Sequence, residues 1–461
     1  MQKNHAIILA GGKGSRMKSL DPNLSKVAYP ILGVPLVKYV LKAVKPLING
    51  KLVTVVGYAG EATKAIVEND SEVVWQHEQK GTGHAVQQAT PLLEKETGLT
   101  LIINGDTPLF KKETVEQLFL EHVAKGHDLT LLTAIVPDPT GYGRILRNAN
   151  GFVEEIVEQA DASDEVKLIN EVNTGVYVFN NELLFQELGN LVANNAQGEL
   201  YLTDLLKMFN ERGYVVGASI LKDPLEMSGI NNRVQLAEVA KVMQKQINDR
   251  LMLDGVSIED PSQTYIGPDV LIAPDTIIAP GTTILGKCTI GAMNKIGPNT
   301  YLENTNIGDH NRVLSSYLTD TTVGDYNELG PYLKTRANSI IGNHCRVGNF
   351  VELKNVILHD GVKSAHLSYL GDAEIGERTN IGCGTITANY DGVKKYRTTI
   401  REDVFIGSGT ILIAPVEVKR GGFTAAGSTI NEDVEEDELS IARARQVHKP
   451  GLAVRFHKPK K

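Results

Sequence analysis

Glycines and cationic side chains cluster near the start of the chain, in a combination suited to phosphate chemistry. The segment reads Leu9-Ala10-Gly11-Gly12-Lys13-Gly14-Ser15-Arg16-Met17, and Lys26 follows downstream. Glycines let backbone N–H groups approach phosphate oxygens closely, and cations stabilise the charge on a transferring phosphoryl group. The spacing is neither that of a P-loop nor that of a dinucleotide-binding fingerprint. The segment therefore predicts a nucleoside triphosphate site of another kind.

Two further polar segments could complete this site. Residues 78–85 form a polar loop that enters an apolar helix, and such a loop can hydrogen-bond the edge of a base. Residues 104–107 end an apolar run with a single carboxylate, Asp106. An aspartate in that position is as often a turn cap. However, Mg²⁺ beside phosphates needs oxygen ligands and takes one or two from side chains, so Asp106 is a candidate ligand.

The second half of the chain contains a lone histidine, His366, with Arg336 and Lys354 nearby in the sequence. A lone histidine is more often structural than catalytic. The two cations, however, could pair with a sugar phosphate, and a polar insertion at residues 388–396 interrupts the surrounding pattern. Amide formation from an amine and a thioester needs a base, and a histidine that is neutral near pH 7 suits that task. His366 is therefore a candidate general base.

Alternating strands and helices must position the first of these sites. Residues 6–10, 51–57 and 99–105 are apolar runs that end at glycines, while residues 35–45 and 112–124 have helical patterns. This alternation predicts a mostly parallel sheet covered on both faces. Ligands bind beyond the carboxyl ends of the strands in such sheets, which places residues 11–16 and 104–107 in the site.

A repeat of six residues organises the second half. After a predicted helix at residues 233–253, aliphatic or small residues recur at every sixth position in several runs. The runs comprise Ile266, Ile272, Ile278, Ile284, Ile290, Ile296 and Leu302; Ile307 and Val313; Ile341, Val347 and Leu353; Ile375 and Ile381; and Ile400, Ile406, Leu412, Val418, Thr424 and Ile430. Such a period predicts a parallel β-helix, whereas a β-sandwich would give irregular spacing. We predict domains at residues 1–229 and 255–461, the second with a C-terminal tail, and a linker helix at 230–254.

Composition restricts the class of protein. A chain of 461 residues with 42% hydrophobic and 22% charged residues fits two globular domains. The net charge of −8 makes nucleic acid an unexpected partner, and neither a membrane-spanning run nor a signal peptide is predicted. Three cysteines without a Cys-x-x-Cys pair argue against a disulfide framework or a zinc site and favour the cytoplasm. The basic tail is either a solvated end or an anion site, and it comprises His448, Lys449, Arg455, His457, Lys458, Lys460 and Lys461.

The first half resembles the sugar-phosphate nucleotidyltransferases, specifically the uridyltransferase half of the bacterial bifunctional N-acetylglucosamine-1-phosphate uridyltransferase/glucosamine-1-phosphate acetyltransferases. The matching stretches are residues 11–17, 26, 79–85, 105–106, 141–145, 156–158, 170–175 and 229–233. The resemblance implies that Arg16 and Lys26 hold the phosphates of UTP, and that Asp106 and Asn231 bind Mg²⁺. It implies a UTP and UDP-sugar site that includes Leu9, Ala10, Gly11, Gly12 and Asn231, with Gln79, Gly81 and Thr82 at uracil and Gly143, Glu158 and Asn173 at N-acetylglucosamine-1-phosphate.

The second half resembles the acetyltransferase of the same family over about residues 251–446. The matching stretches are residues 336, 347–354, 366–372, 380–382, 389–392 and 407–408. The resemblance implies a left-handed coil, a homotrimer with sites between subunits, and His366 as the general base. It implies a glucosamine-1-phosphate site at Arg336, Lys354, Tyr369 and Asn380, and an acetyl-CoA site at Cys383, Asn389, Tyr390, Ser408, Ala426 and Arg443. The family usually has Ala, Thr, Pro and Ala where this chain has Gly11, Ser15, Ala337 and Cys383; for Cys383 we expect a packing role.

The resemblance implies two consecutive reactions on small-molecule substrates. Acetyl-CoA and glucosamine-1-phosphate would give N-acetylglucosamine-1-phosphate, which UTP would convert to UDP-N-acetylglucosamine with release of pyrophosphate. One alternative is a sugar-1-phosphate nucleotidyltransferase whose β-helix serves only oligomerisation or regulation, although such a coil would not need His366 with the loop at residues 389–392. Another is a non-catalytic regulatory subunit, which would be expected to lose Arg16, Lys26 or Asp106.

Overall fold

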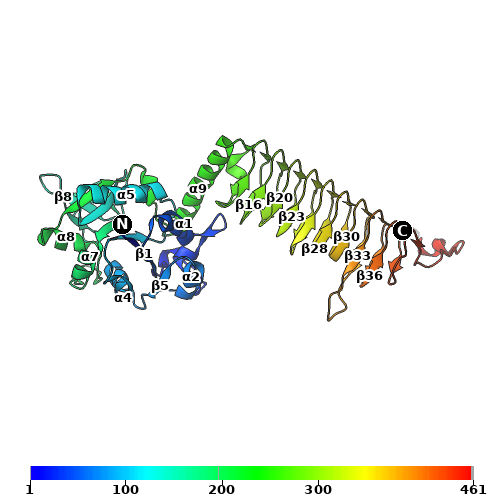
Figure 1. The fold of residues 1–461 in the computed structure, drawn as a ribbon, viewed down its shortest axis with the longest axis horizontal. Helices are drawn as coiled ribbons and strands as arrows, with labels where there is room; N and C mark the ends of the chain where they lie inside the picture. The colour runs from blue at the N-terminus through cyan, green and yellow to red at the C-terminus, as the bar shows by residue number, and fades with distance from the viewer. Residues whose placement is uncertain (1, 196, 458–461) are drawn as a thin grey trace. The chain divides into compact units, whose positions relative to one another are not determined.

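The computed structural model describes residues 2–195 and 197–457. The chain forms two compact units, with the boundary between Met243 and Gln244 (Figure 1). The boundary falls inside helix α9 (Arg233–Leu253), whose bounds agree with the helix expected from the sequence. Three lysines of the basic tail, Lys458, Lys460 and Lys461, lie outside the described residues. Within the described part of the chain, every helix is too short or too polar to span a bilayer.

The first unit is built on a nine-stranded sheet with the order β11-β7-β10-β6-β1-β4-β5 and with β8 and β9 attached to β10. The strands are β1 (Asn4–Ala10), β4 (Leu52–Val56), β5 (Glu72–Trp75), β6 (Leu99–Asn104), β7 (Leu129–Ile135), β8 (Arg144–Arg147), β9 (Val153–Val157), β10 (Glu171–Asn180) and β11 (Val216–Ile220). Strand β1 pairs in parallel with β4 and β6, as the apolar runs predict. Strand β10 runs antiparallel to both β6 and β7, which the sequence pattern did not indicate.

Helices cover both faces of this sheet. They are α1 (Leu36–Val44), α2 (Gly60–Val67), α3 (Thr82–Gln87), α4 (Thr90–Leu93), α5 (Lys112–Lys125), α6 (Asp164–Lys167), α7 (Asn181–Leu188) and α8 (Asp204–Glu211). Neighbouring residues of β1 enter different cores: Ile8 packs with Val40 of α1, whereas Ile7 packs with Leu184 of α7. Because strand side chains alternate between faces, a strand buried on both sides reads as a continuous apolar run.

The carboxyl ends of three parallel strands bring polar residues to one edge of the sheet. Gly11 follows β1, Asp106 follows β6 and Gln76 follows β5. A small hairpin of β2 (Pro30–Ile31) and β3 (Val34–Pro35) follows the loop that carries Lys26. The sheet therefore places the glycine-rich turn beside the candidate metal ligand, as the sequence predicts.

The second unit is a parallel β-helix whose short strands stack coil upon coil (Figure 1). One face is an 11-stranded sheet of β12 (Ser257–Ile258), β15 (Ile277–Ile278), β18 (Lys295–Ile296), β21 (Arg312–Val313), β24 (Glu328–Leu329), β27 (Arg346–Val347), β29 (Lys363–Ser364), β31 (Asn380–Ile381), β34 (Phe405–Ile406), β37 (Phe423–Thr424) and β39 (Leu439–Ser440). In-register pairs such as Ile278 with Ile296 join each coil to the next.

A 17-stranded sheet forms the remaining faces of the coil. Its strands are β13 (Tyr265–Ile266), β14 (Leu271–Ile272), β16 (Thr283–Leu285), β17 (Thr289–Ile290), β19 (Tyr301–Glu303), β20 (Asn306–Ile307), β22 (Tyr317–Thr319), β23 (Thr321–Val323), β25 (Lys334–Arg336), β26 (Ser339–Ile341), β28 (Val351–Leu358), β30 (Ser368–Ile375), β32 (Ile386–Ala388), β33 (Thr398–Ile400), β35 (Ile411–Ile413), β36 (Val416–Val418) and β38 (Thr429–Ile430). The residues at every sixth position predicted to point inward are all buried. Their spacing matches the three strands of each coil.

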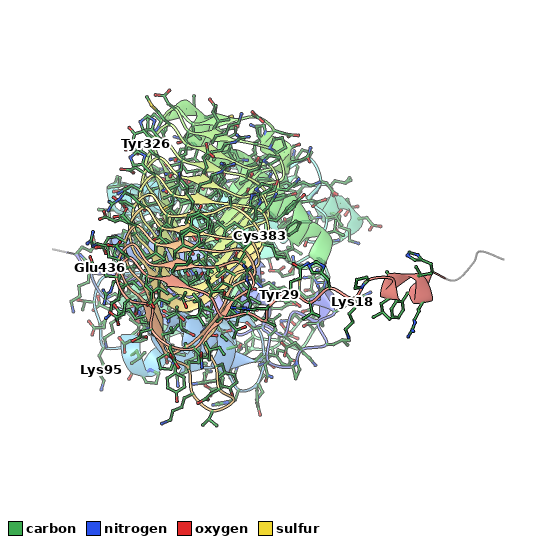
Figure 2. All side chains as sticks on the ribbon, turned by 90° about the vertical axis from the view of Figure 1, so that its right-hand side faces the viewer. Lys18, Tyr29, Lys95, Tyr326, Cys383 and Glu436 are labelled. Carbon is green, nitrogen blue, oxygen red and sulfur yellow. The ribbon has the colours of Figure 1, made fainter. Side chains whose placement is uncertain are left out.

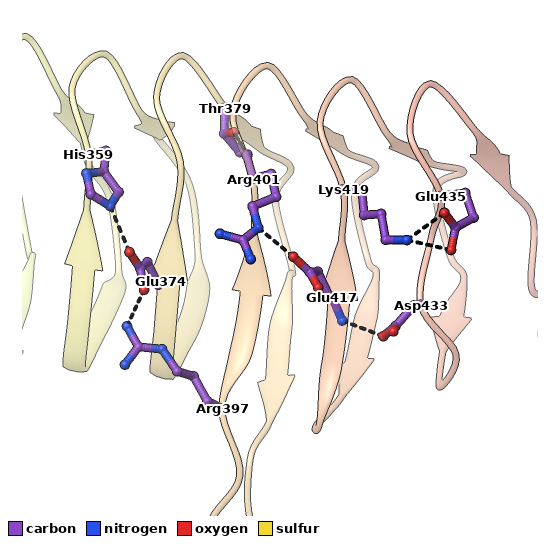
Figure 3. A network of polar contacts seen from close by, with 9 residues as sticks. All are labelled: His359, Glu374, Thr379, Arg397, Arg401, Glu417, Lys419, Asp433 and Glu435. Carbon is purple, nitrogen blue, oxygen red and sulfur yellow. Dashed lines mark hydrogen bonds and ion pairs between the residues drawn. The ribbon is translucent and has the colours of Figure 1, made fainter.

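Polar ladders run along the coil inside and outside. Inside, the Oδ1 atoms of Asn294, Asn311 and Asn327 accept backbone N–H groups of the following coil at 2.7–2.8 Å, so these buried amides are satisfied. Outside, carboxylates and cations alternate from coil to coil, as between Lys419 and Glu435 at 2.6 Å (Figure 3). Exposed pairs of this kind each contribute little to stability, so the buried aliphatic positions carry the fold.

Candidate active sites

Two adjoining cavities of the first unit contain every residue predicted for the first site. The first, of about 330 Å³, is lined among others by Leu9, Ala10, Gly11, Gly12, Lys26, Gln79, Gly81, Thr82 and Asp106. The second, of about 280 Å³, is lined among others by Arg16, Gly143, Glu158, Asn173 and Asn231. Leu9, Thr82, Asn104 and Asp106 line both, so the two cavities meet above the ends of β1 and β6. Folding thus gathers segments from throughout the first 231 residues.

Two side-chain oxygens converge on a cation where the cavities meet. The Lys26 ammonium pairs with the Asp106 carboxylate and donates to Asn231 Oδ1 at 3.2 Å. The Ile230 N–H donates to the Asp106 backbone carbonyl at 3.1 Å, which ties the segment carrying Asn231 to the end of β6. Among the described residues, no three His, Cys, Asp or Glu side chains form a metal-binding group. The oxygen ligands available at this point are therefore the Asp106 carboxylate and the Asn231 amide oxygen.

The loop at residues 78–83 is held against a distant segment. Gly81 has φ +102°, and an added Cβ there would lie 2.5 Å from the Leu200 carbonyl oxygen, so only glycine fits. The Gly83 N–H donates to that carbonyl at 2.8 Å, and the Leu202 N–H donates to Thr82 Oγ1 at 3.0 Å. The predicted Gly81 and Thr82 are therefore rigidly placed.

Sequence reasoning named Gln79 and missed Gln76. Gln79 is exposed, whereas Gln76 is only 4% exposed and also lines the first cavity. The Gln76 side-chain amide donates to the Gly81 carbonyl at 3.0 Å, which fixes its orientation. A Cβ on Gly11 would lie 2.9 Å from Gln76 Oε1, so the glycine found here in place of the usual alanine leaves room for this amide. The sequence did contain a signal for Gln76: it directly follows β5, just as Gly11 directly follows β1, and residues in that position line the site.

The second cavity has polar walls suited to a sugar. Burial raises the pKa of Glu158 above its usual range, even though the Thr203 hydroxyl lies within 3.5 Å. The Asn173 side chain donates to the Tyr177 hydroxyl at 2.7 Å, and the Asn173 backbone N–H donates to the Gly143 carbonyl at 2.9 Å. A bulge in β10 beginning at Asn173 turns this segment toward the cavity.

In the second unit, His366 is exposed and does not point into the coil. It lines a cavity of about 240 Å³ together with Arg312, Glu328, Arg346 and Asn349 among others. The Ser368 hydroxyl donates to the His366 carbonyl at 3.0 Å and holds the corner on which the histidine stands. The imidazole is thus free to meet a ligand.

A cationic group lies on neighbouring coils. Arg336 pairs in register with Lys354, and Tyr369 pairs with Glu352, which also accepts hydrogen bonds from Arg336 at 2.9 and 3.0 Å. Lys354 Nζ lies 2.8 Å from Asp372 Oδ2, and this bond raises the pKa of Lys354. The predicted Arg336, Lys354 and Tyr369 therefore come together on one face.

Two residues of this group, Asp372 and Lys395, were missed as functional residues. Burial favours a raised pKa for Asp372, but hydrogen bonds from Asn355, Lys354 and Asn389 outweigh it and lower the pKa. Lys395, from the inserted loop, contacts Lys354, and that contact lowers the pKa of Lys395. Two ammonium groups so close together favour a bound anion. The sequence signal for Lys395 as a functional residue was its basic side chain within the polar insertion at residues 388–396.

Four of the six residues predicted for acetyl-CoA lie along one corner of the β-helix, namely Cys383, Ser408, Ala426 and Arg443. Successive coils have equivalent corner positions at His366, Cys383, Ser408 and Ala426, as the in-register pairing of the preceding strands shows. Backbone hydrogen bonds join these corners: the Gly409 N–H donates to the Cys383 carbonyl at 2.7 Å, and the Gly427 N–H donates to the Ser408 carbonyl at 2.8 Å. In Figure 2, Cys383 lies on the opposite side of the coil from Glu436. Arg443 returns to this corner and donates to the Ala426 carbonyl at 2.5 Å.

The other predicted residues have different positions. Asn380 lies on β31, next to Lys363 of the preceding coil. Asn389 is buried and donates to Asp372, so it joins the cationic group. Tyr390 is 59% exposed, and its hydroxyl donates to Gly392 within the inserted loop at 2.6 Å.

Comparison with known proteins covers both halves. The family model for nucleotidyl transferases matches residues 5–224. Proteins called bifunctional protein GlmU match nearly end to end: one from an Exiguobacterium species is 48% identical over 98% of this chain and 99% of its own length, and one from Geobacillus thermodenitrificans is 45% identical over 100% of both. The chain belongs to the GlmU family.

Membership of the GlmU family confirms the resemblance found in the sequence. The matched nucleotidyltransferase region contains the whole nine-stranded sheet, from β1 to β11. The full-length matches extend through the coil, so the fold class is also confirmed: a Rossmann-like α/β nucleotidyltransferase domain followed by a left-handed parallel β-helix. The GlmU protein from Bacillus velezensis is likewise 45% identical over 99% of this chain and 100% of its own length.

Proposed function

We propose that this chain makes UDP-N-acetylglucosamine in two consecutive transfers, one in each half. Acetyl transfer to glucosamine-1-phosphate gives N-acetylglucosamine-1-phosphate, and uridylyl transfer from UTP completes the nucleotide sugar. The observation that carries this proposal is the presence of a glycine-rich turn beside Lys26 in one unit, and of an exposed His366 together with a separate cationic group around Lys354 in the other. Residues 1–229 and 255–461 would hold the two activities, joined by residues 230–254. Relatives named bifunctional, matched end to end, support it.

Uridylyl transfer needs binding and charge stabilisation rather than covalent catalysis by the protein. Gln76, Gln79, Gly81 and Thr82 bind uracil, while Arg16 and Lys26 balance the triphosphate charge. Gly143, Glu158 and Asn173 hold N-acetylglucosamine-1-phosphate. A phosphate oxygen of the sugar attacks the α-phosphorus in line, the bond to the β-phosphate oxygen breaks, and pyrophosphate leaves.

A magnesium ion fits the same site. The Asp106 and Asn231 oxygens already converge on the Lys26 ammonium, so the donor type and the placement suit a hard cation. Asp106 and Asn231 would hold the Mg²⁺, which supplies charge neutralisation for the phosphates. The two side chains orient toward the point where the cavities meet, which is where the triphosphate would bind.

Acetyl transfer needs a base and an anion site. Arg336, Lys354, Tyr369 and Asn380 bind glucosamine-1-phosphate, and Lys395 adds a second ammonium beside Lys354. His366 takes one proton from the sugar ammonium, so that the nitrogen can attack the thioester carbonyl. The C–S bond then breaks, the nitrogen loses its second proton to the sulfur, and CoA leaves as the thiol. The acetyl-CoA site comprises Cys383, Asn389, Tyr390, Ser408, Ala426 and Arg443.

The proposal includes a homotrimer in the cytoplasm. Exposed apolar side chains on the coil, such as Tyr332, Phe350 and Leu367 at 58–60% exposure, support association of copies through this unit. All three cysteines are free, and Cys383 is exposed, which suits a reducing compartment.

Separation of the two activities tests the proposal. His366→Ala should abolish CoA release from acetyl-CoA with glucosamine-1-phosphate and leave UTP-dependent pyrophosphate release intact. Asp106→Ala should have the reverse effect. His359→Ala is the matched control, because it removes an exposed histidine of the same coil that pairs with Glu374. If the wild-type chain released no CoA, the β-helix would be structural only; if one substitution ended both reactions in a folded protein, the two-site proposal would fail.

A further inference from the structure

Among the described residues, the largest fully buried side chain is an arginine. Arg144, the first residue of β8, is 1% exposed, and its guanidinium bonds only neutral groups among the described residues. These are the Tyr142 carbonyl, Gln159 Oε1 at 2.8 Å and the Lys167 carbonyl at 3.4 Å. Its Nε is buried without a partner in the described structure. The pKa of the exposed Asp138 is lowered mainly by hydrogen bonds from Thr140 and to a smaller extent by the charge of Arg144, but among the described residues no carboxylate forms an ion pair with this guanidinium. Burying a charge without a directly paired opposite charge is expensive, so a function has to explain its presence.

The guanidinium and the Gln159 amide together hold one turn. Gln159 Oε1 accepts two hydrogen bonds, from Arg144 Nη2 and from the Gly141 N–H at 3.1 Å. The second terminal nitrogen of the guanidinium, Nη1, donates to the carbonyl of Tyr142, the central residue of that turn. Gln159 and Arg144 therefore hold the first two residues of the Gly141–Gly143 segment, Gly141 by its N–H and Tyr142 by its carbonyl. Gly141 has φ +88°, so its conformation needs a glycine and external support.

This turn forms a wall of the second cavity. Gly141, Tyr142 and Gly143 all line it, and a Cβ added to Gly143 would lie 3.0 Å from the Ile156 side chain and 3.3 Å from Glu158 Oε2. The wall is therefore closely packed against the carboxylate proposed to bind the sugar. A small displacement of the turn would change the shape of the cavity at this point.

We propose that Arg144 and Gln159 are positioning residues that set the specificity for the N-acetyl group of the sugar phosphate. This inference rests on the proposed uridylyl transfer, in which Gly143, Glu158 and Asn173 contact the sugar. In this proposal the pair touches no substrate but holds the Gly141–Gly143 turn, which lines the second cavity, in the position where it would contact the acetamido group, so that sugars without this group lack the contact. The proposed UTP site comprises the first cavity and the point where the two cavities meet, whereas the Gly141–Gly143 turn lines only the second cavity, so binding of UTP is not affected.

The inference is tested by removing Gln159 Oε1, the acceptor that Arg144 and Gly141 share. Gln159→Leu abolishes both hydrogen bonds at nearly constant volume, and should lower kcat/KM for N-acetylglucosamine-1-phosphate about tenfold, mainly through KM. The kcat/KM for glucose-1-phosphate should change less than twofold, so that discrimination between the two sugars falls. The KM for UTP and the CoA release of the second half should stay unchanged. Gln159→Glu keeps the acceptor oxygen and should restore most of the discrimination.

The controls separate this inference from the proposed function and from misfolding. Gln117→Leu is the matched control, since the exposed Gln117 of α5 donates a side-chain hydrogen bond to Glu121, one turn along the same helix. If the wild-type chain fails to release pyrophosphate, the proposed function fails. If wild type is active but Gln159→Leu retains full discrimination, or loses activity equally toward both sugar phosphates, the positioning role is wrong.

Discussion

A buried histidine should make the first unit sensitive to acid. His122 on α5 is 2% exposed, and its Nδ1 lies 2.9 Å from Thr130 Oγ1 of β7. Burial, assisted by the nearby His127, lowers the pKa of His122 from 6.5 to about 4. The folded state therefore keeps this ring neutral at a pH where the unfolded chain protonates it.

The sign and size of the effect follow from proton linkage. Because the folded state binds fewer protons, the stability conferred by the neutral ring is complete above pH 6.5 and is lost as the pH falls toward 4. At 1.36 kcal/mol per pKa unit, the free energy of unfolding should fall by about 2 kcal/mol between pH 8 and pH 5 from His122 alone. Burial also lowers the pKa of His127, which adds to the loss in the same direction.

The only tryptophan of the chain provides a selective assay. Trp75 lies on β5, so its fluorescence follows the unfolding of the first unit without a tryptophan signal from the coil. Urea unfolding at pH 8 and pH 5 should show that His122→Gln loses about 2 kcal/mol less than wild type over this interval. His310→Gln, an exposed histidine of the β-helix, is the control and should behave as wild type. Parallel losses in wild type and His122→Gln would refute the reasoning.

Three further predictions use the same two reactions and the same probe. Gly57→Ala should raise the KM for UTP about tenfold without changing CoA release, because the added Cβ would lie 2.6 Å from the Gly11 carbonyl oxygen and displace the phosphate-binding turn; an unchanged KM would mean that the turn adjusts freely. Asp372→Asn should raise the KM for glucosamine-1-phosphate about tenfold at unchanged UTP kinetics, since the carboxylate that holds Lys354 and Asn389 in place is lost; a change in the UTP reaction instead, or a lower KM, would contradict this assignment. Leu302→Ala should lower the free energy of unfolding of the coil, followed by circular dichroism, by about 2–5 kcal/mol while the tryptophan transition stays in place.

Periodicity made the architecture predictable from the sequence. An aliphatic residue at every sixth position allows one inward side chain on each strand of a coil, and Ile266 through Ile430 are buried as that rule requires. The apolar runs before Gly11 and before Gly105 likewise identify strands buried on both faces, and the loops after them contain the polar residues of the first site. The antiparallel β10 escaped prediction because its direction depends on its neighbours rather than on its own pattern.

What the tertiary structure alone decided is how residues distant in the sequence meet. Gln76 and Gln79 are equally polar in the sequence, but only the end of β5 buries Gln76 beside Gly81. The contact of Lys395 with Lys354 depends on how an inserted loop folds back over the coil. Burial of Arg144 arises from the packing of β8 under residues 159 and 167, and nothing in a local pattern distinguishes it from a surface arginine. Local composition determines the elements, whereas burial and charge proximity, which set pKa and binding, arise only from their packing.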